Sequence, residues 1–262
     1  MTLRLITFPI SHFCEKARWA LDRARLDYRE EGHLPLFQIA AVRRAGGKRQ
    51  VPVLALPEGG GIPDSTPILH YIDTLVAPAL RLFPEEPAQR REVEALEERF
   101  DKTLGPAARR VVYLHLLREP VLLNRYLVHG LPAWQRAIFP AYRPLLSRLI
   151  RRGLRVTEEA AARDEEKLRV LFAEIGERLA DGRRYLVGDR FTAADLTFAA
   201  LGAPLLGPAQ YGVPLPTLAE MPPRLREKIE GYRATAAGKF LLRLYAEERG
   251  TAALRAVPPS GG

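Results

Sequence analysis

Cysteine is almost absent from this sequence of 262 residues, because Cys14 is the only one. A single cysteine excludes a disulfide within the chain and leaves a cysteine-ligated zinc site with one ligand. We therefore expect no structural zinc and no other metal. A chain of this length buries enough apolar surface to fold without such cross-links.

Long apolar runs are also missing. The richest one, from Val111 to Leu117, ends at Arg118 and is far shorter than the roughly 20 residues that span a bilayer. The first residues lack the charged and apolar regions of a signal peptide. We expect no transmembrane segment and a cytoplasmic protein.

Lysine is scarce as well: 34 of the 40 basic residues are arginine, and the formal net charge is +9. Apolar residues make up 47% of the chain and charged residues 27%, which is ordinary for a folded globular protein. Seven arginines and no acidic residue lie between 120 and 157. Such a segment suits an acidic substrate, an anionic membrane surface or nucleic acid, but also a plain solvated helical face. We favour the solvated face and expect no nucleic-acid partner.

Two patterns divide the chain. Short apolar runs alternate with helical spacing at 3–8, 13–26, 51–56 and 68–76, which predicts an α/β region with a hairpin strand at 51–54. Three prolines between 77 and 87 mark a connector. Helical stripes then follow, including Val93, Leu96, Phe100 and Leu104. We predict an α/β domain at 1–78, an all-α domain at 88–255 with an insertion at about 118–157, and a disordered tail at 256–262.

Three local features of the first domain suggest a binding site. Ser11 lies at the predicted start of a helix, where a hydroxyl and the helix dipole favour a thiolate, although it also suits a plain helix cap. Proline in the apparent strand at Val51–Pro52 is either a cis bond, which turns the backbone outward, or a trans edge residue. Asp64–Ser65 begins the next predicted helix with Ser65 as its cap, and the pair suits an α-amino acid group.

The order and spacing of these features resemble the cytosolic glutathione transferase superfamily. That resemblance implies a thioredoxin-like domain followed by a helical bundle, with glutathione as co-substrate. Ser11 matches the residue that stabilises the glutathione thiolate. Glutathione-binding positions are matched by Gln50, Val51, Pro52, Asp64 and Ser65.

A second part of the resemblance lies at 188–196, which is similar to a helix-initiating signature of that family. Thr192 and Asp195 form a capping pair, flanked by the hydrophobic pair Phe191 and Leu196. We assign Asp195 to folding rather than to catalysis.

The chain departs from the family after Ser11. His12 replaces a common proline and is a candidate proton donor. Cys14 occupies the second position of a C-x-x-C redox motif whose first position is Ser11, and it suits either a small core residue or a redox thiol.

The predicted function is that of a glutathione transferase-like enzyme acting on a small, hydrophobic electrophile. The alternatives are a glutathione-dependent thiol-disulfide oxidoreductase that uses Cys14, and a non-catalytic binding or regulatory protein of the same fold. The resemblance implies a homodimer and an electrophile pocket between the domains. Candidate pocket residues are Phe8, Arg109, Tyr113 and His115.

Overall fold

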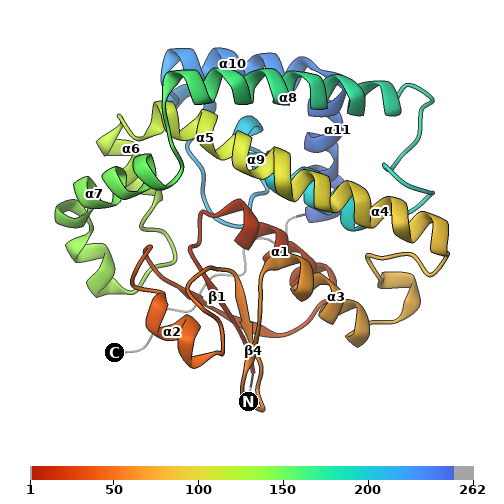
Figure 1. Cartoon of the computed structure of the whole chain (residues 1–262), viewed down its shortest axis with the longest axis horizontal. Helices are drawn as coiled ribbons and strands as arrows, with labels where there is room; N and C mark the ends of the chain where they lie inside the picture. The colour runs from red at the N-terminus through yellow and green to blue at the C-terminus, as the bar shows by residue number, and fades with distance from the viewer. Residues whose placement is uncertain (1, 251–262) are drawn as a thin grey trace.

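A four-stranded sheet organises the first third of the protein, seen here in a computed structural model that describes residues 2–250. The strands are β1 (Leu3–Thr7), β2 (Tyr28–Gly32), β3 (Val53–Ala55) and β4 (Gly61–Pro63), in the order β2-β1-β3-β4. β1 is parallel to β2 and antiparallel to β3, and β3 and β4 form the predicted hairpin. Helices α1 (His12–Arg23), α2 (Ile39–Arg44) and α3 (Ser65–Leu75) complete a thioredoxin-like unit (Figure 1). The tail expected at 256–262 lies outside the described residues.

The remainder is helical, as expected. It comprises α4 (Pro87–Arg99), α5 (Gly105–Leu116), α6 (Pro120–Tyr126), α7 (Ala133–Gly153), α8 (Glu158–Arg178), α9 (Ala193–Leu206), α10 (Pro223–Ala234) and α11 (Ala236–Leu244). Residues Phe100–Leu104 continue α4 into α5 as a π-helical turn, and Tyr245–Arg249 form another. Short 3₁₀ turns lie at Pro78–Leu80 and Leu218–Glu220. The expected stripe Val93, Leu96, Phe100 and Leu104 is buried throughout.

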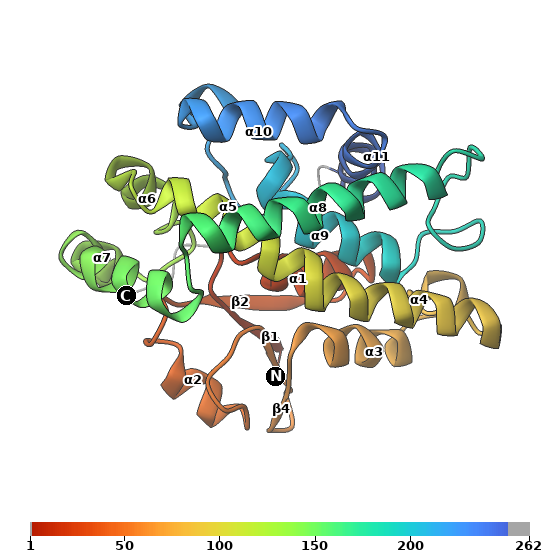
Figure 2. The same cartoon turned by 45° about the horizontal axis from the view of Figure 1, so that its top comes forward.

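One apolar core joins the sheet to the helices. α1 packs between the sheet and α9, and α9 is buried on nearly all sides because it is apolar around its whole circumference. Trp19 of α1 is 1% exposed and lies against Phe191 and Tyr245, with ring centroids 5.7 and 4.7 Å away. The sheet therefore depends on the helical part to cover α1 (Figure 2).

The start of α9 confirms the predicted capping box. Asp195 Oδ1 accepts a hydrogen bond from the Leu186 amide at 2.8 Å, and Oδ2 accepts one from the Thr192 amide at 2.9 Å. Phe191 and Leu196 are both buried beside it. Burial raises the pKa of Asp195 from 3.8 to about 6, although the hydrogen bonds from Leu186 and Thr192 act in the opposite direction.

The arginine-rich segment 120–157, which we expect to be an insertion, forms α6 and α7, which lie at one end of the molecule above α2 (Figures 1 and 2). Gln135 Oε1 accepts from the Leu34 amide at 2.7 Å, and the Tyr142 hydroxyl donates to Pro35 O at 2.7 Å. The insertion thus rests on the segment between β2 and α2. Six of its arginines form no ion pair with any residue that the structure describes: Arg136, Arg143, Arg148, Arg151, Arg152 and Arg155.

Helix α7 also leaves apolar side chains exposed: the exposed fraction is 54% for Trp134 and 48% for Leu145. Within residues 2–250, no helix is both long and apolar enough to span a membrane.

Candidate functional site

The register of the sheet brings the three predicted features to one edge. Ile6 near the end of β1 pairs with Val53 at the start of β3, and Val53 pairs with Pro63 at the end of β4. Ser11 follows β1, the Val51–Pro52 pair precedes β3, and Asp64 follows β4. Because neighbouring strands are antiparallel here, all three segments leave the sheet at the same end.

The Val51–Pro52 bond is cis, which decides between the two interpretations of this proline. Pro52 is buried, and its carbonyl accepts a hydrogen bond from the Asp64 amide at 3.0 Å. In the described part of the chain, neither the amide nor the carbonyl of Val51 has a hydrogen-bond partner. Both groups are therefore free to bind an extended peptide. The neighbouring Gln50 is exposed.

The start of α3 requires a correction. Asp64, not Ser65, is the cap: its φ is 75°, and its Oδ1 accepts from the Ser65 amide at 2.6 Å. Aspartate tolerates this left-handed backbone, and its carboxylate reaches the first free amide of the helix. Ser65 is the first helical residue and is fully buried, whereas Asp64 is exposed.

Ser11 precedes α1, but its hydroxyl caps no backbone amide. The Ser11 amide donates to Phe8 O at 2.8 Å, which closes the turn between β1 and α1. Burial raises the pKa of the Cys14 thiol to about 12, and a hydrogen bond from the Ser11 side chain only partly opposes this. Cys14 is 0% exposed, so the structure supports its interpretation as a core residue.

His12 does not have the geometry of a proton donor. Its side chain is buried, and Nε2 donates to Gly105 O at 3.1 Å, which ties α1 to α5. Burial, together with the nearby positive charge of Arg109, lowers the pKa of His12 to about 3. The imidazole is therefore neutral near pH 7 and has no proton to give as an imidazolium. The predicted donor role is not supported.

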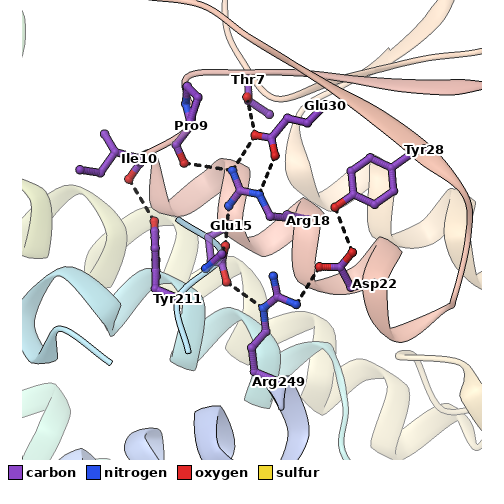
Figure 3. Close-up of polar contacts among 11 residues, drawn as sticks. Thr7, Pro9, Ile10, Glu15, Arg18, Asp22, Tyr28, Glu30, Tyr211 and Arg249 are labelled. Atoms are coloured by element: carbon purple, nitrogen blue, oxygen red, sulfur yellow. Dashed lines mark hydrogen bonds and ion pairs between the residues drawn. The ribbon is translucent and has the colours of Figure 1, made fainter. Parts of the chain in front are cut away.

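Two contacts that the sequence analysis missed hold the turn before Ser11. Arg18 Nη2 donates to Pro9 O at 3.0 Å, and the Tyr211 hydroxyl donates to Ile10 O at 3.0 Å (Figure 3). Arg18 is itself fixed by Glu30, which accepts from Nε at 2.9 Å and Nη2 at 2.7 Å. Burial opposes the ionised form of Glu30, but Arg18 and Thr7 outweigh it and lower the pKa of Glu30.

A second buried arginine extends this network to the end of the described chain. Arg249 Nε donates to Glu15 at 2.9 Å and Nη1 donates to Asp22 at 2.7 Å, while the Tyr28 hydroxyl also donates to Asp22 (Figure 3). Glu15 is shared between Arg249 and Arg18. Only the i, i+3 spacing of Glu15 and Arg18 was visible in the sequence, because the other partners lie far along the chain.

A narrow cavity of about 70 Å³ is lined in part by Ile10 and His12, the chain neighbours of Ser11, whereas Ser11 is not among its lining residues. Arg109 and Tyr113 of α5 line it as well, so the structure brings these two predicted pocket residues together. The opposite walls are apolar and come from α6 and from the segment after α9. This segment supplies Tyr211, Leu215 and Met221, which sequence reasoning missed because nothing local indicates where it folds.

The other two predicted pocket residues lie elsewhere. Phe8 packs into an apolar cluster with Leu34 and Leu114 and is not among the residues that line the cavity. His115, two residues beyond Tyr113, points to the other side of α5, where Lys228 and Glu165 influence its charge. Helical geometry separates the two faces, since positions two apart diverge by about 200°.

Comparisons with known proteins agree with this architecture. Residues 5–79 match the glutathione S-transferase N-terminal domain and residues 135–206 match the glutathione S-transferase C-terminal domain. Together the two matches span more than half of the chain, and the chain belongs to the glutathione S-transferase superfamily. Among curated proteins, none matches this sequence.

Solved structures share the fold at low identity. A glutathione S-transferase of Methylobacterium radiotolerans in complex with glutathione sulfonate has 22% identity and a TM-score of 0.53, covering 92% of this chain and 95% of its own. One of Ceriporiopsis subvermispora in complex with glutathione has 18% identity and a TM-score of 0.59, covering 95% and 98%. The β-etherase LigF of Sphingobium sp. strain SYK-6 has 19% identity and a TM-score of 0.57, covering 93% and 99%.

Proposed function

We propose that this protein is a glutathione transferase that binds glutathione at the sheet edge and transfers it to an apolar electrophile in the adjacent cavity. The observation that carries this proposal is the convergence of Ser11, cis Val51–Pro52 and Asp64–Ser65 at one end of the sheet. Ile10 and His12, on either side of Ser11 in the chain, line the adjacent cavity. The complexes of two structural neighbours with glutathione or its sulfonate support the choice of ligand.

Each part of the site has a distinct role in binding. The free amide and carbonyl of Val51 pair with the cysteinyl backbone of glutathione, as one strand pairs with another. The N-terminus of α3, which begins at Ser65, receives the γ-glutamyl carboxylate, because the helix dipole favours an anion there. Asp64 is exposed and pairs with the ammonium, and the Gln50 amide reaches the backbone beside Val51.

The chemical step uses the sulfur that glutathione brings. The glutathione thiol loses its proton to solvent water, and the Ser11 hydroxyl donates a hydrogen bond to the resulting thiolate. Each unit by which this lowers the thiol pKa corresponds to about 1.4 kcal/mol. The thiolate then forms a carbon–sulfur bond with the electrophile, and the leaving group departs with its electron pair. Holding both reactants side by side supplies the rest of the rate enhancement.

The alternatives fit the structure less well. A redox role for Cys14 requires an accessible thiolate, whereas this thiol is fully buried and has a raised pKa. A non-catalytic binding protein would use the exposed apolar and unpaired basic side chains of α7. A homodimer remains a proposal that rests on family membership.

Calorimetric binding of reduced glutathione, with an ultraviolet scan for bound thiolate, tests the proposal. We expect Asp64→Asn, which keeps a capping side chain, to weaken binding about tenfold or more, because the ion pair with the ammonium is lost. Ser11→Ala should retain binding and lose the thiolate band. Ser147→Ala on α7 is the matched control and should change neither.

S-methylglutathione, which has no free thiol, should bind without producing the band. Absence of binding at millimolar glutathione would overturn the proposal and make the α7 surface the next place to search.

A further inference from the structure

Among the described residues that line the cavity, Arg109 is the only charged one. Its Nε atom is buried and has no hydrogen-bond acceptor. Within residues 2–250, its guanidinium forms no ion pair, and no Asp or Glu lines the cavity. Burial lowers the pKa of Arg109, with a further contribution from Arg110, but an arginine stays protonated near pH 7.

Three other arginines that are buried or partly buried have carboxylate partners. Arg18 contacts the carboxylates of Glu15 and Glu30, and Arg249 contacts those of Glu15 and Asp22. Arg110, adjacent to Arg109 on α5, pairs with Asp164 and donates to Leu154 O. Each of these three arginines thus has a carboxylate partner, whereas Arg109 has none among residues 2–250.

An unpaired buried charge is costly, and a planar guanidinium is shaped to bind a carboxylate with two parallel hydrogen bonds. The rest of the cavity is apolar, with Leu116, Leu123, Leu215 and Met221 on its walls. Its neutral polar side chains are few, and one of them, the Tyr211 hydroxyl, already donates to Ile10 O.

We propose that the second substrate is an apolar molecule that carries one carboxylate, with the carboxylate on Arg109 and the apolar part against the leucines and Met221. This inference rests on the proposed transferase function and specifies its substrate class. Because Ile10 and His12 of the same cavity flank Ser11, the bound substrate lies beside the place where the thiolate is held. Arg109 acts as the specificity-determining residue.

The experiment compares two probes of the same size and different charge, 4-phenylbutyrate and 4-phenylbutan-1-ol, by calorimetry without glutathione. We expect the native protein to bind the carboxylate at least about tenfold more tightly than the alcohol. Arg109→Met removes the charge and keeps most of the volume, so the preference should disappear while the alcohol still binds. Arg109→Lys should retain part of the preference, because lysine keeps the positive charge but lacks the two parallel N–H donors of the guanidinium.

Arg118→Met is the matched control, since this exposed arginine near the end of α5 pairs only with Glu158 at the surface. It should leave the preference intact. Thermal unfolding checks the fold of each variant, and Arg109→Met should unfold no lower than the native protein because it removes an uncompensated charge.

Equal affinity for the two probes, no binding of the carboxylate at millimolar concentration, or a preference that survives Arg109→Met would overturn the proposal. Glutathione is absent from these titrations, so their outcome is independent of glutathione binding. A carboxylate preference in a protein that does not bind glutathione would contradict only the proposed transferase function. Glutathione binding without a preference for the carboxylate probe would contradict only the proposed substrate class.

Discussion

Ser11 and Cys14 show how burial separates two side chains that lie one helical turn apart. The Ser11 hydroxyl is partly exposed and free of any capping bond, whereas the Cys14 thiol is enclosed within the core. A hydrogen bond from Ser11 lowers the Cys14 pKa, but desolvation is the larger effect and keeps the thiol protonated. We propose that the Ser11 hydroxyl turns from Cys14 to the sulfur of a bound ligand.

We predict that Cys14 does not react with a water-soluble disulfide reagent such as 5,5′-dithiobis(2-nitrobenzoate) in the native protein at pH 8. Full reaction of one thiol per chain should appear only on unfolding in urea, since Cys14 is the sole cysteine. The reaction is followed by absorbance, with the urea-unfolded sample as control. Rapid labelling of the folded protein would revive the oxidoreductase hypothesis.

At the scale of an element, α9 shows what a buried cap does. Asp195 satisfies two buried amides, of Leu186 and Thr192, and in doing so it anchors the segment before α9 to the helix. The sequence predicted the cap because its partners lie within a few residues. Burial made the cap pH-sensitive, which the local motif does not reveal.

The stability that Asp195 contributes should fall as pH rises. The pKa of Asp195 is about 6 in the folded protein, against 3.8 for an ordinary aspartate. Between pH 3.8 and 6 the folded protein therefore binds a proton at Asp195 that the unfolded chain has released. The contribution is complete below pH 4 and is lost as pH passes 6. We expect the free energy of unfolding of the native protein, minus that of Asp195→Asn, to decrease by up to about 3 kcal/mol between pH 4 and 7. Urea titrations of both proteins at pH values across this range measure the difference in their free energies of unfolding.

Asp189→Asn, at an exposed position of the same segment, is the control and should show no such trend. A difference between the native protein and Asp195→Asn that stays constant from pH 4 to 7 would contradict the raised pKa.

For the whole molecule, the main feature is the core shared by the sheet and the helices. Trp19, Leu5 and Leu54 of the first part belong to the same apolar cluster as Phe198 and Leu241 of the second. Arg249 adds a buried ionic link from the end of the described chain to α1. We propose that the connector at 77–87 separates two architectures, an α/β part and an all-α part, whereas the shared core makes the two parts one folding unit.

This predicts a single unfolding transition. In Trp134→Phe, which alters an exposed side chain, Trp19 becomes the only tryptophan and reports on the contact between α1 and the helices. Its fluorescence should change at the same urea concentration as the circular dichroism signal of the helices. A fluorescence transition that clearly precedes the helical one would show that the two parts unfold separately.

What the sequence by itself determined rests on interactions between neighbouring residues. The hairpin at β3 and β4, the capping pair Thr192 and Asp195, the helical stripes and the division into an α/β and an all-α part follow from spacing and local chemistry. The motifs at Ser11, Val51–Pro52 and Asp64–Ser65 were also visible, although the cis bond and the identity of the cap were not.

Only the tertiary structure decided which of these side chains face a ligand. It buried His12 and Cys14, turned His115 away from Tyr113, and held the turn before Ser11 through Arg18 and Tyr211. Among the described residues, it also placed no acid in an ion pair with Arg109. Each outcome depends on residues brought together from distant positions, and the free energy of burying a charge or a thiol is set by that assembly rather than by the local sequence.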